Sequence, residues 1–207
     1  MTTTVFLVRH GQTNSNISGY YMGWSDEDIN DTGYTQVRRL SSRLSDSPID
    51  AIYVSPLRRT CSTATVLAEP HRLELKVLDD LIEINLGDWQ GLHIDEIKKR
   101  WPELWIQSRS NPSKFTMPNG ESFQQVSERA ARAYDVILAA NQNKLVVIVS
   151  HEVVVKVLVT HILGTTNSIY RRFNADNASL SVLRINDGNA RLITLNDISH
   201  LDNMKQD

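Results

Sequence analysis

Short runs of β-branched and apolar residues alternate with longer stretches of helical periodicity along most of this chain. We expect strands at residues 5–8, 51–54, 75–78, 145–149, 181–185 and 191–195. Between residues 32 and 44, Val37, Leu40 and Leu44 recur at the spacing of an amphipathic helix. Further helices are expected after Pro56 and across residues 152–163. Strands separated by helices indicate an α/β fold with a largely parallel sheet covered on both faces.

The stretch around residues 93–118 departs from this alternation. It is rich in tryptophan and proline, carries no strand pattern, and is expected to form two helices around Trp101-Pro102. We interpret it as a helical, cap-like insertion over one edge of the sheet. Trp101 and Trp105 lie one helical turn apart and should pack under this cap. A long helix is expected to follow, from near Ser122.

Charge and cysteine content narrow the classes of function. The 22 Lys and Arg residues nearly balance the 24 Asp and Glu residues, which gives no electrostatic case for a nucleic-acid or membrane partner. The apolar stretch 145–163 is interrupted by charged residues and histidines, so we do not expect it to span a bilayer. Cys61 is the single cysteine, and no secretory signal precedes Arg9. These features favour the cytoplasm.

Polar residues gather where the expected strands end. Arg9 and His10 follow the first strand, Arg59 lies just after the second, Glu83 follows the third, and His151 ends the fourth. In open α/β sheets ligands bind at the carboxyl ends of the strands, so these side chains should converge on one rim.

This set of residue types suits phosphoryl transfer. Guanidinium groups neutralise a phosphomonoester, and a neutral His10 could attack phosphorus to form a covalent phosphohistidine. Arg9, Arg59 and His151 would then hold the phosphate oxygens. A protonated Glu83 would protonate the leaving group and later accept a proton from water. The expected substrate is a small phosphomonoester.

The spacing of residues in this sequence does not match the motifs of other hydrolase mechanisms. His151-Glu152 begins a zinc-protease H-E-x-x-H motif, but Val155 occupies the second histidine position. Cys61 is followed six positions later by Leu67 instead of the arginine of a cysteine phosphatase loop. The chain also lacks a G-x-x-x-x-G-K-[ST] phosphate loop.

Six ordered blocks of the sequence resemble the histidine phosphatase (phosphoglycerate mutase-like) superfamily. They are L-V-R-H-G-Q-T-N-S-N from Leu7, S-P-L-R-R-T from Ser55, E-I-N-L-G-D-W-Q-G from Glu83, N-G-E-S from Asn119, V-S-H from Val149 and N-A-S from Asn177. The resemblance implies one domain over residues 1–207, with three α/β/α layers and a mainly parallel sheet of roughly six strands.

The same resemblance implies roles for individual residues. His10 would be the phosphorylated histidine and Glu83 the proton donor, while Arg9, Asn16, Arg59 and His151 would bind phosphate. Because the family's arginine lies four residues after the serine, Arg59 is expected in the pocket and Arg58 outside it. No metal and no other cofactor is implied.

Within the superfamily the sequence looks closest to the phosphatase members. It resembles the metal-independent phosphoserine phosphatases, which makes phosphoserine one candidate substrate. Leu86, however, stands where those enzymes carry a histidine that we associate with recognising serine. Broad-acting phosphatases and ribazole phosphatases stay open, as do two other functions: a phosphoglycerate mutase and a non-catalytic module that binds phosphorylated ligands.

Five residues are candidates for substrate specificity: Gln12, Tyr21, Trp24, Leu86 and Glu152. Glu152 stands where the family most often has glycine. It could act only as a favourable charge at a helix start, or it could border the pocket and disfavour highly anionic substrates. The oligomeric state is left open, with a homodimer as one alternative.

Overall fold

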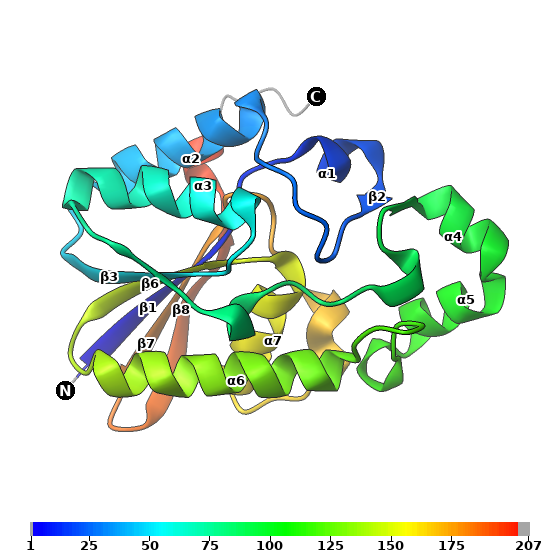
Figure 1. Ribbon diagram of the computed structural model, residues 1–207. Helices are drawn as coiled ribbons and strands as arrows, with labels where there is room; N and C mark the ends of the chain where they lie inside the picture. Colours follow the sequence, from blue (N-terminus) through cyan, green and yellow to red (C-terminus); the bar gives the residue numbers. More distant parts are fainter. Residues whose placement is uncertain (1, 203–207) are drawn as a thin grey trace.

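The computed structural model describes residues 2–202. Its centre is a six-stranded sheet with the strand order β4-β3-β6-β1-β7-β8 (Figure 1). The strands are β1 (Thr2–Arg9), β3 (Ile49–Val54), β4 (Leu75–Val77), β6 (Leu145–Ser150), β7 (Leu180–Asn186) and β8 (Asn189–Asp197). The pairs β1–β6, β3–β6 and β3–β4 are parallel, while β7 runs antiparallel to both β1 and β8. All six expected strands are present, and the mainly parallel sheet is confirmed.

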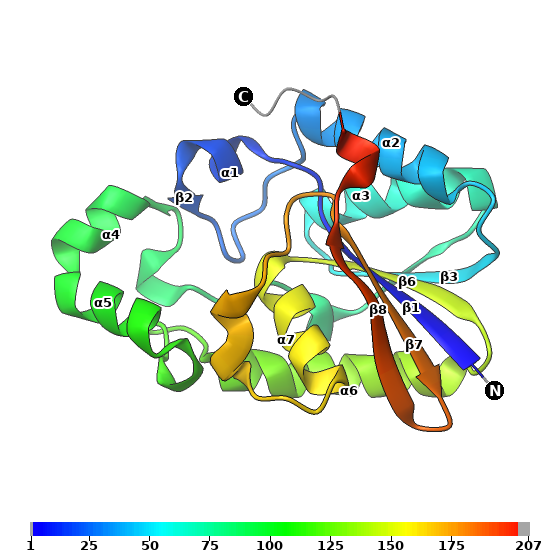
Figure 2. The same ribbon diagram turned by 180° about the vertical axis from the view of Figure 1, so that it is seen from behind.

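Helices cover both faces of the sheet. Helices α2 (Asp31–Leu44) and α3 (Arg58–Ala68) lie on one face, and α6 (Phe123–Ala140) and α7 (Glu152–Ile162) lie on the other (Figures 1 and 2). Alternate residues of β1 serve the two faces: Phe6 and Val8 pack with the α2 and α3 side, Val5 and Leu7 with the α6 and α7 side. A strand buried on both faces needs apolar residues throughout, which explains its composition. The three-layer α/β/α architecture is confirmed.

Two helices stand away from the sheet, α4 (Ile94–Arg100) and α5 (Pro102–Ser110) (Figure 1). The first ends at Arg100 and the second begins at Pro102, so they flank Trp101 as the sequence predicts. Trp101 and Trp105 pack on the buried Trp89, with ring centroids 6.5 and 6.1 Å apart, and neither lines the large cavity described below. The expectation that these two tryptophans pack within the protein is confirmed.

Several short elements carry no periodicity and were missed by sequence reasoning. Helix α1 spans Asn14–Ser18, and strands β2 (Tyr20–Tyr21) and β5 (Leu92–His93) form a separate two-stranded sheet. Because β5 includes His93, the expectation of no strand from residue 93 onward was wrong at its first residue. The remaining 3₁₀ turns are η1 (Glu69–His71), η2 (Asp79–Leu81), η3 (Gly87–Trp89), η4 (Pro112–Lys114), η5 (Asn167–Arg172) and η6 (Ser199–Leu201).

Backbone hydrogen bonds continue one residue beyond the central strands. The His10 amide donates to the Ser150 carbonyl at 3.0 Å, and the Ser55 amide donates to the Val149 carbonyl at 3.2 Å. The residues that follow β1, β3 and β6 are therefore held side by side at the carboxyl edge of the sheet.

Candidate active site

His10 lies directly after β1 and is buried. Its Nδ1 is 2.7 Å from the Gly11 carbonyl oxygen, which can only accept a hydrogen bond. Nδ1 therefore carries the proton, and Nε2 keeps its lone pair. Burial, followed by the charges of Arg9 and Arg59, holds the pKa of His10 well below its usual value. The ring is neutral at pH 7 and can act as a nucleophile through Nε2.

Arg59 occupies the first turn of α3 and is buried. Its Nη1 and Nη2 donate to the carbonyls of Ser25 and Gly23 at 2.9 and 2.7 Å. Each Nη atom has a second hydrogen, so the anchored guanidinium still offers two donors to a ligand. The neighbouring Arg58 is 66% exposed and pairs with Asp28. The expectation that Arg59 faces the pocket and Arg58 faces solvent is confirmed.

His151 is fully buried next to His10, with the two ring centroids 5.3 Å apart. Its Nδ1 accepts from Arg59 Nε at 3.2 Å, so its Nε2 carries the proton and donates to Ser55 Oγ at 2.7 Å. Both ring nitrogens are thus used within the protein, and His151 is not among the residues that line the cavity. This arrangement does not support the expectation that His151 holds a phosphate oxygen directly; it orients Arg59.

Arg9 ends β1 and lines the same cavity as His10 and Arg59. One Nη1 hydrogen bond goes to the Ala175 carbonyl at 2.7 Å, and the same atom lies 3.3 Å from Glu152 Oε2. Its buried Nε has no hydrogen-bond partner among residues 2–202. A buried donor without a partner is costly, so the Arg9 guanidinium is suited to receive an anion.

Glu83 supplies a carboxyl group to this cavity. Burial raises its pKa, against the opposing effects of a hydrogen bond from the Ile84 amide and the charge of Arg59. Its backbone carbonyl accepts hydrogen bonds from Trp24 Nε1 at 2.6 Å and Arg129 Nη2 at 2.9 Å. A carboxyl with a raised pKa beside a nucleophilic histidine fits the role of a general acid.

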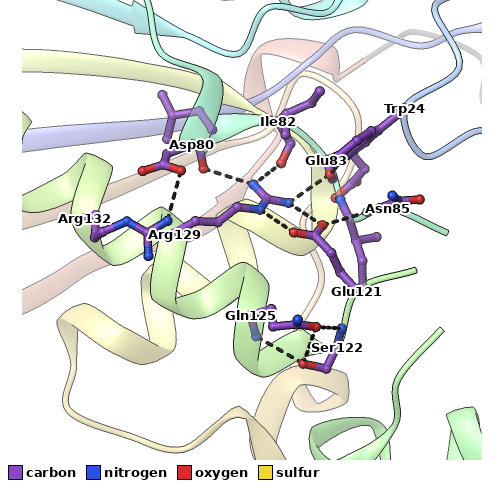
Figure 3. A network of polar contacts seen from close by, with 12 residues as sticks. Trp24, Asp80, Ile82, Glu83, Asn85, Glu121, Ser122, Gln125, Arg129 and Arg132 are labelled. Carbon is purple, nitrogen blue, oxygen red and sulfur yellow. Dashed lines mark hydrogen bonds and ion pairs between the residues drawn. The ribbon is translucent and has the colours of Figure 1, made fainter. Parts of the chain in front are cut away.

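Arg129 organises the loop that carries Glu83 (Figure 3). It lies on the buried face of α6 and donates to the carbonyls of Asp80, Ile82 and Glu83. The carboxylate of Glu121 pairs with it at 2.9 Å and also accepts from the Asn85 amide at 2.8 Å. Sequence reasoning missed Arg129, although a charged residue on the apolar face of a predicted helix was the available signal.

Two glycines allow this loop to approach the start of α6. Gly87 has a φ of +53°, and a Cβ there would lie 1.9 Å from the Pro118 carbonyl oxygen. A Cβ on Gly120 would lie 2.4 Å from the Asn85 carbonyl oxygen. The two segments can therefore touch only because both positions lack side chains.

The expected phosphate ligand Asn16 also lines the cavity. Its Oδ1 accepts from the Thr13 amide and from Asn177 Nδ2, both at 3.0 Å. Asn177 Nδ2 also approaches the His10 carbonyl at 3.1 Å. Asn177 was not among the predicted site residues; it ties α1 to the end of β1 and so positions Asn16 near His10.

The candidate specificity residues divide into two groups. Tyr21, Leu86 and Glu152 line the cavity, but Gln12 and Trp24 do not. The Gln12 amide and side chain bond to Gln36 and Asn30, and the Trp24 indole bonds to the Glu83 carbonyl. For Gln12 and Trp24 the expectation of direct substrate contact is therefore not supported, because neither residue lines the cavity.

Glu152 sits in the first turn of α7 and borders the cavity. Burial would raise its pKa, but Arg9 and Lys156 outweigh burial and lower it. Its two oxygens pair with these cations, at 3.3 Å to Arg9 and 2.8 Å to Lys156 Nζ. Because this pairing balances its charge, the expectation that Glu152 repels anionic substrates is not supported.

The cavity has a volume of about 790 Å³ and opens between the sheet, α1, α5 and η5. Its cationic lining residues are Arg9, Arg59, Arg109, Lys156 and Arg171, and its acidic ones are Glu27, Glu83 and Glu152. Residues 2–202 contain no group of three His, Cys, Asp or Glu side chains that could hold a metal ion. Within the same part of the chain, no helix is long and apolar enough to cross a membrane.

Comparisons of the sequence and of the structure with known proteins point to the same family. The sequence model of the histidine phosphatase superfamily (branch 1) matches residues 5–198. Phosphoserine phosphatase 1 of Hydrogenobacter thermophilus is 34% identical over 95% of this chain and 93% of its own. The structure of Bacillus stearothermophilus YhfR superposes with a TM-score of 0.92 at 29% identity, covering 97% of this chain and 100% of that one. The alpha-ribazole phosphatase of Shigella flexneri gives a TM-score of 0.86 at 28% identity, over 94% and 96%.

Proposed function

This chain belongs to the histidine phosphatase superfamily and is a phosphomonoesterase, and we propose that it acts through a phosphohistidine formed on His10. The observation that carries the proposal is the state of His10: a neutral ring whose proton is held on Nδ1 and whose Nε2 is free. The guanidinium groups of Arg9 and Arg59 and a carboxyl of raised pKa, that of Glu83, line the same cavity. The substrates we propose are small phosphomonoesters, with phosphoserine among them.

In the first step His10 Nε2 attacks phosphorus and forms a P–N bond. The bond between phosphorus and the alcohol oxygen breaks, and the Glu83 carboxyl gives its proton to that oxygen as the alcohol leaves. Nδ1 keeps its proton against the Gly11 carbonyl throughout, so the bond at 2.7 Å stabilises the ring as its charge rises. A neutral nucleophile and a protonated acid are both required at the start, and burial favours both states.

In the second step water attacks the phosphohistidine. The Glu83 carboxylate accepts a proton from that water, the P–N bond breaks, and inorganic phosphate leaves with His10 neutral again. Arg9 and Arg59 stabilise the charge on the phosphoryl oxygens in both steps. His151 acts by holding the Arg59 Nε and thereby the plane of its guanidinium.

We also propose that the reaction needs no metal and takes place in the cytoplasm. The positive charge around His10 comes from arginines, and Cys61 as the single cysteine is compatible with a reducing compartment. One domain with a helical cap-like insertion around residues 93–118 is our proposed organisation of the chain.

Release of inorganic phosphate tests the proposal. The purified protein should hydrolyse p-nitrophenyl phosphate and at least some metabolite phosphomonoesters, with the same rate in excess EDTA. His10→Ala should abolish turnover, because no other histidine within residues 2–202 lines the cavity. Arg58→Met is the matched control, since this exposed arginine lies beside Arg59 but outside the cavity. Activity that EDTA abolishes and a divalent cation restores would contradict the mechanism.

A further inference from the structure

The cavity carries more positive charge than a phosphate group needs. Five cationic side chains line it against three glutamates, and Glu83 must be protonated for the first step of the proposed reaction. With Glu83 neutral, the lining has a net charge of about +3, and a phosphate dianion balances two of these charges. One positive charge is left, and it has no function in the chemistry at phosphorus.

Two of the cations that line the cavity, Lys156 and Arg171, lie against the same aromatic ring, that of Tyr170. A line of contacts leads to them from the phosphate end: Glu152 pairs with Lys156, and Lys156 Nζ lies 4.7 Å from the centre of the Tyr170 ring. The Arg171 guanidinium lies over the same ring at 5.9 Å. Lys156 is buried and fixed by these contacts, so α7 supplies one of the cations in this part of the cavity.

Arg171 connects this end to the cap. Its Nη2 donates to the Ser108 carbonyl in α5 at 3.2 Å, next to Arg109. Figures 1 and 2 show the η5 segment between α7 and α5, consistent with this contact. Arg109 in turn lies 5.4 Å from the Trp105 ring centre. Arg109 and Arg171 therefore line the cavity from two elements that are hydrogen-bonded to each other, α5 and η5.

Neither arginine has a carboxylate partner within residues 2–202. The ion pairs of this region join Glu152 to Arg9 and Lys156 only. Partial burial and then the charge of Arg109 lower the pKa of Arg171, which reports the repulsion between the two cations. A pair of like charges without a counterion is unfavourable unless an anion binds between them.

We propose that Arg109 and Arg171, supported by Lys156, bind a carboxylate on the leaving group of the substrate. This inference rests on the proposed function and defines its substrate class as phosphomonoesters that carry one further negative charge. A carboxylate supplies that single charge and matches the planar guanidinium group. A second phosphate would bring up to two charges, more than the surplus.

Matched substrate pairs test the subsite. We would measure kcat/KM for phosphoserine against phosphoethanolamine, and for 6-phosphogluconate against glucitol 6-phosphate, so that only the second member of each pair lacks the carboxylate. The variants are Arg171→Met and Arg109→Met. The control is Arg172→Met, which removes an exposed neighbouring arginine that does not line the cavity.

Each cavity variant should lower the preference for the carboxylate member of at least one pair about tenfold, as expected for a partly exposed charged contact. The loss should shrink in added salt. The Arg172→Met preference should stay within about twofold of wild type. Unchanged preferences in both cavity variants, or an equal change in Arg172→Met, would overturn the subsite. A change confined to fructose 1,6-bisphosphate over fructose 6-phosphate would overturn the carboxylate assignment.

A different result would contradict the proposed function without deciding the carboxylate subsite. A wild-type protein that hydrolyses none of these compounds, nor p-nitrophenyl phosphate, would overturn the phosphatase mechanism. Calorimetric binding of phosphoserine and phosphoethanolamine to wild type and Arg171→Met would then decide the subsite alone. Tighter binding of phosphoserine that Arg171→Met removes would support it, and equal binding of the two compounds would overturn it.

Discussion

Two groups of opposite character, the buried base His10 and the partly buried acid Glu83, control which atoms carry protons at this site. Burial penalises the charged form of each, so it lowers the pKa of the His10 base and raises the pKa of the Glu83 acid. The neutral imidazole and the protonated carboxyl can therefore coexist over a wider pH range than exposed groups would allow. Reactivity here follows from where the fold places these residues, since neither side chain is unusual in itself.

Replacement of Glu83 by glutamine should separate substrates by leaving group. We expect Glu83→Gln to lower kcat by roughly 10²–10⁴-fold for alkyl phosphates, the usual contribution of a general acid. The loss should be much smaller for p-nitrophenyl phosphate, whose leaving group needs little protonation. Steady-state kinetics on the two substrates check this, and equal losses on both would remove Glu83 from the role of acid.

The pH dependence of kcat/KM also tests the protonation state of the Glu83 carboxyl. Because the raised pKa keeps Glu83 protonated to higher pH, kcat/KM for an alkyl phosphate should fall only as the pH rises through that raised pKa. The Glu83→Gln variant cannot lose this proton, so its alkaline limb should disappear. A wild-type limb that persists unchanged in the variant would assign the titration to another group.

At the scale of elements, the site depends on contacts between segments that are far apart in the sequence. The turns after β1, β3 and β6 are joined by backbone hydrogen bonds, and one side chain of α6 donates to three carbonyls of the Glu83 loop. That side chain, Arg129, contacts three carbonyls and the Glu121 carboxylate while almost fully buried. Such a network holds the acid in place only if all of its members are present.

Loss of Arg129 should therefore affect stability and catalysis together. We expect Arg129→Met to lower the free energy of unfolding by about 3 kcal/mol, because the largely buried Glu121 carboxylate would lose its cationic partner and three carbonyls would lose their donor. Arg129→Lys should recover part of the loss. Arg132→Met, on the exposed side of the same helix, should cost about 0.5 kcal/mol or less.

Denaturant unfolding measures these stabilities, and kcat on an alkyl phosphate measures the position of Glu83. If Arg129 positions Glu83, the folded fraction of Arg129→Met should retain p-nitrophenyl phosphate hydrolysis better than alkyl phosphate hydrolysis. Equal stabilities of Arg129→Met and Arg132→Met would contradict the network.

At the scale of the whole molecule, much of the architecture could be predicted because the sheet is buried on both faces. Val5 to Val8 and Leu145 to Val149 must be apolar to pack against two helical layers, and that requirement is visible in sequence. The convergence of Arg9, His10, Arg59 and Glu83 on one cavity followed from their places after the strands.

Other features depend on long-range side-chain geometry that no local pattern encodes. The hydrogen bonds of His151 to Arg59 and Ser55 join the ends of two strands, β6 and β3, that are far apart in the sequence, so its two engaged nitrogens could not be foreseen. Arg171 reaches the cavity only because η5 packs against α5. Gln12 is two residues from His10 in sequence, yet its polar groups bond to α2 and the loop before it.

The central claim is that phosphate passes through His10, and trapping the intermediate tests it most directly. We would mix the protein with a radiolabelled phosphomonoester, quench in alkali, and locate the label by peptide mass spectrometry. A phosphoramidate on His10 should be stable in alkali, labile in acid and absent from His10→Ala, while Glu83→Gln should still carry label from p-nitrophenyl phosphate. Label that survives acid, lies on another residue or persists in His10→Ala would contradict the mechanism.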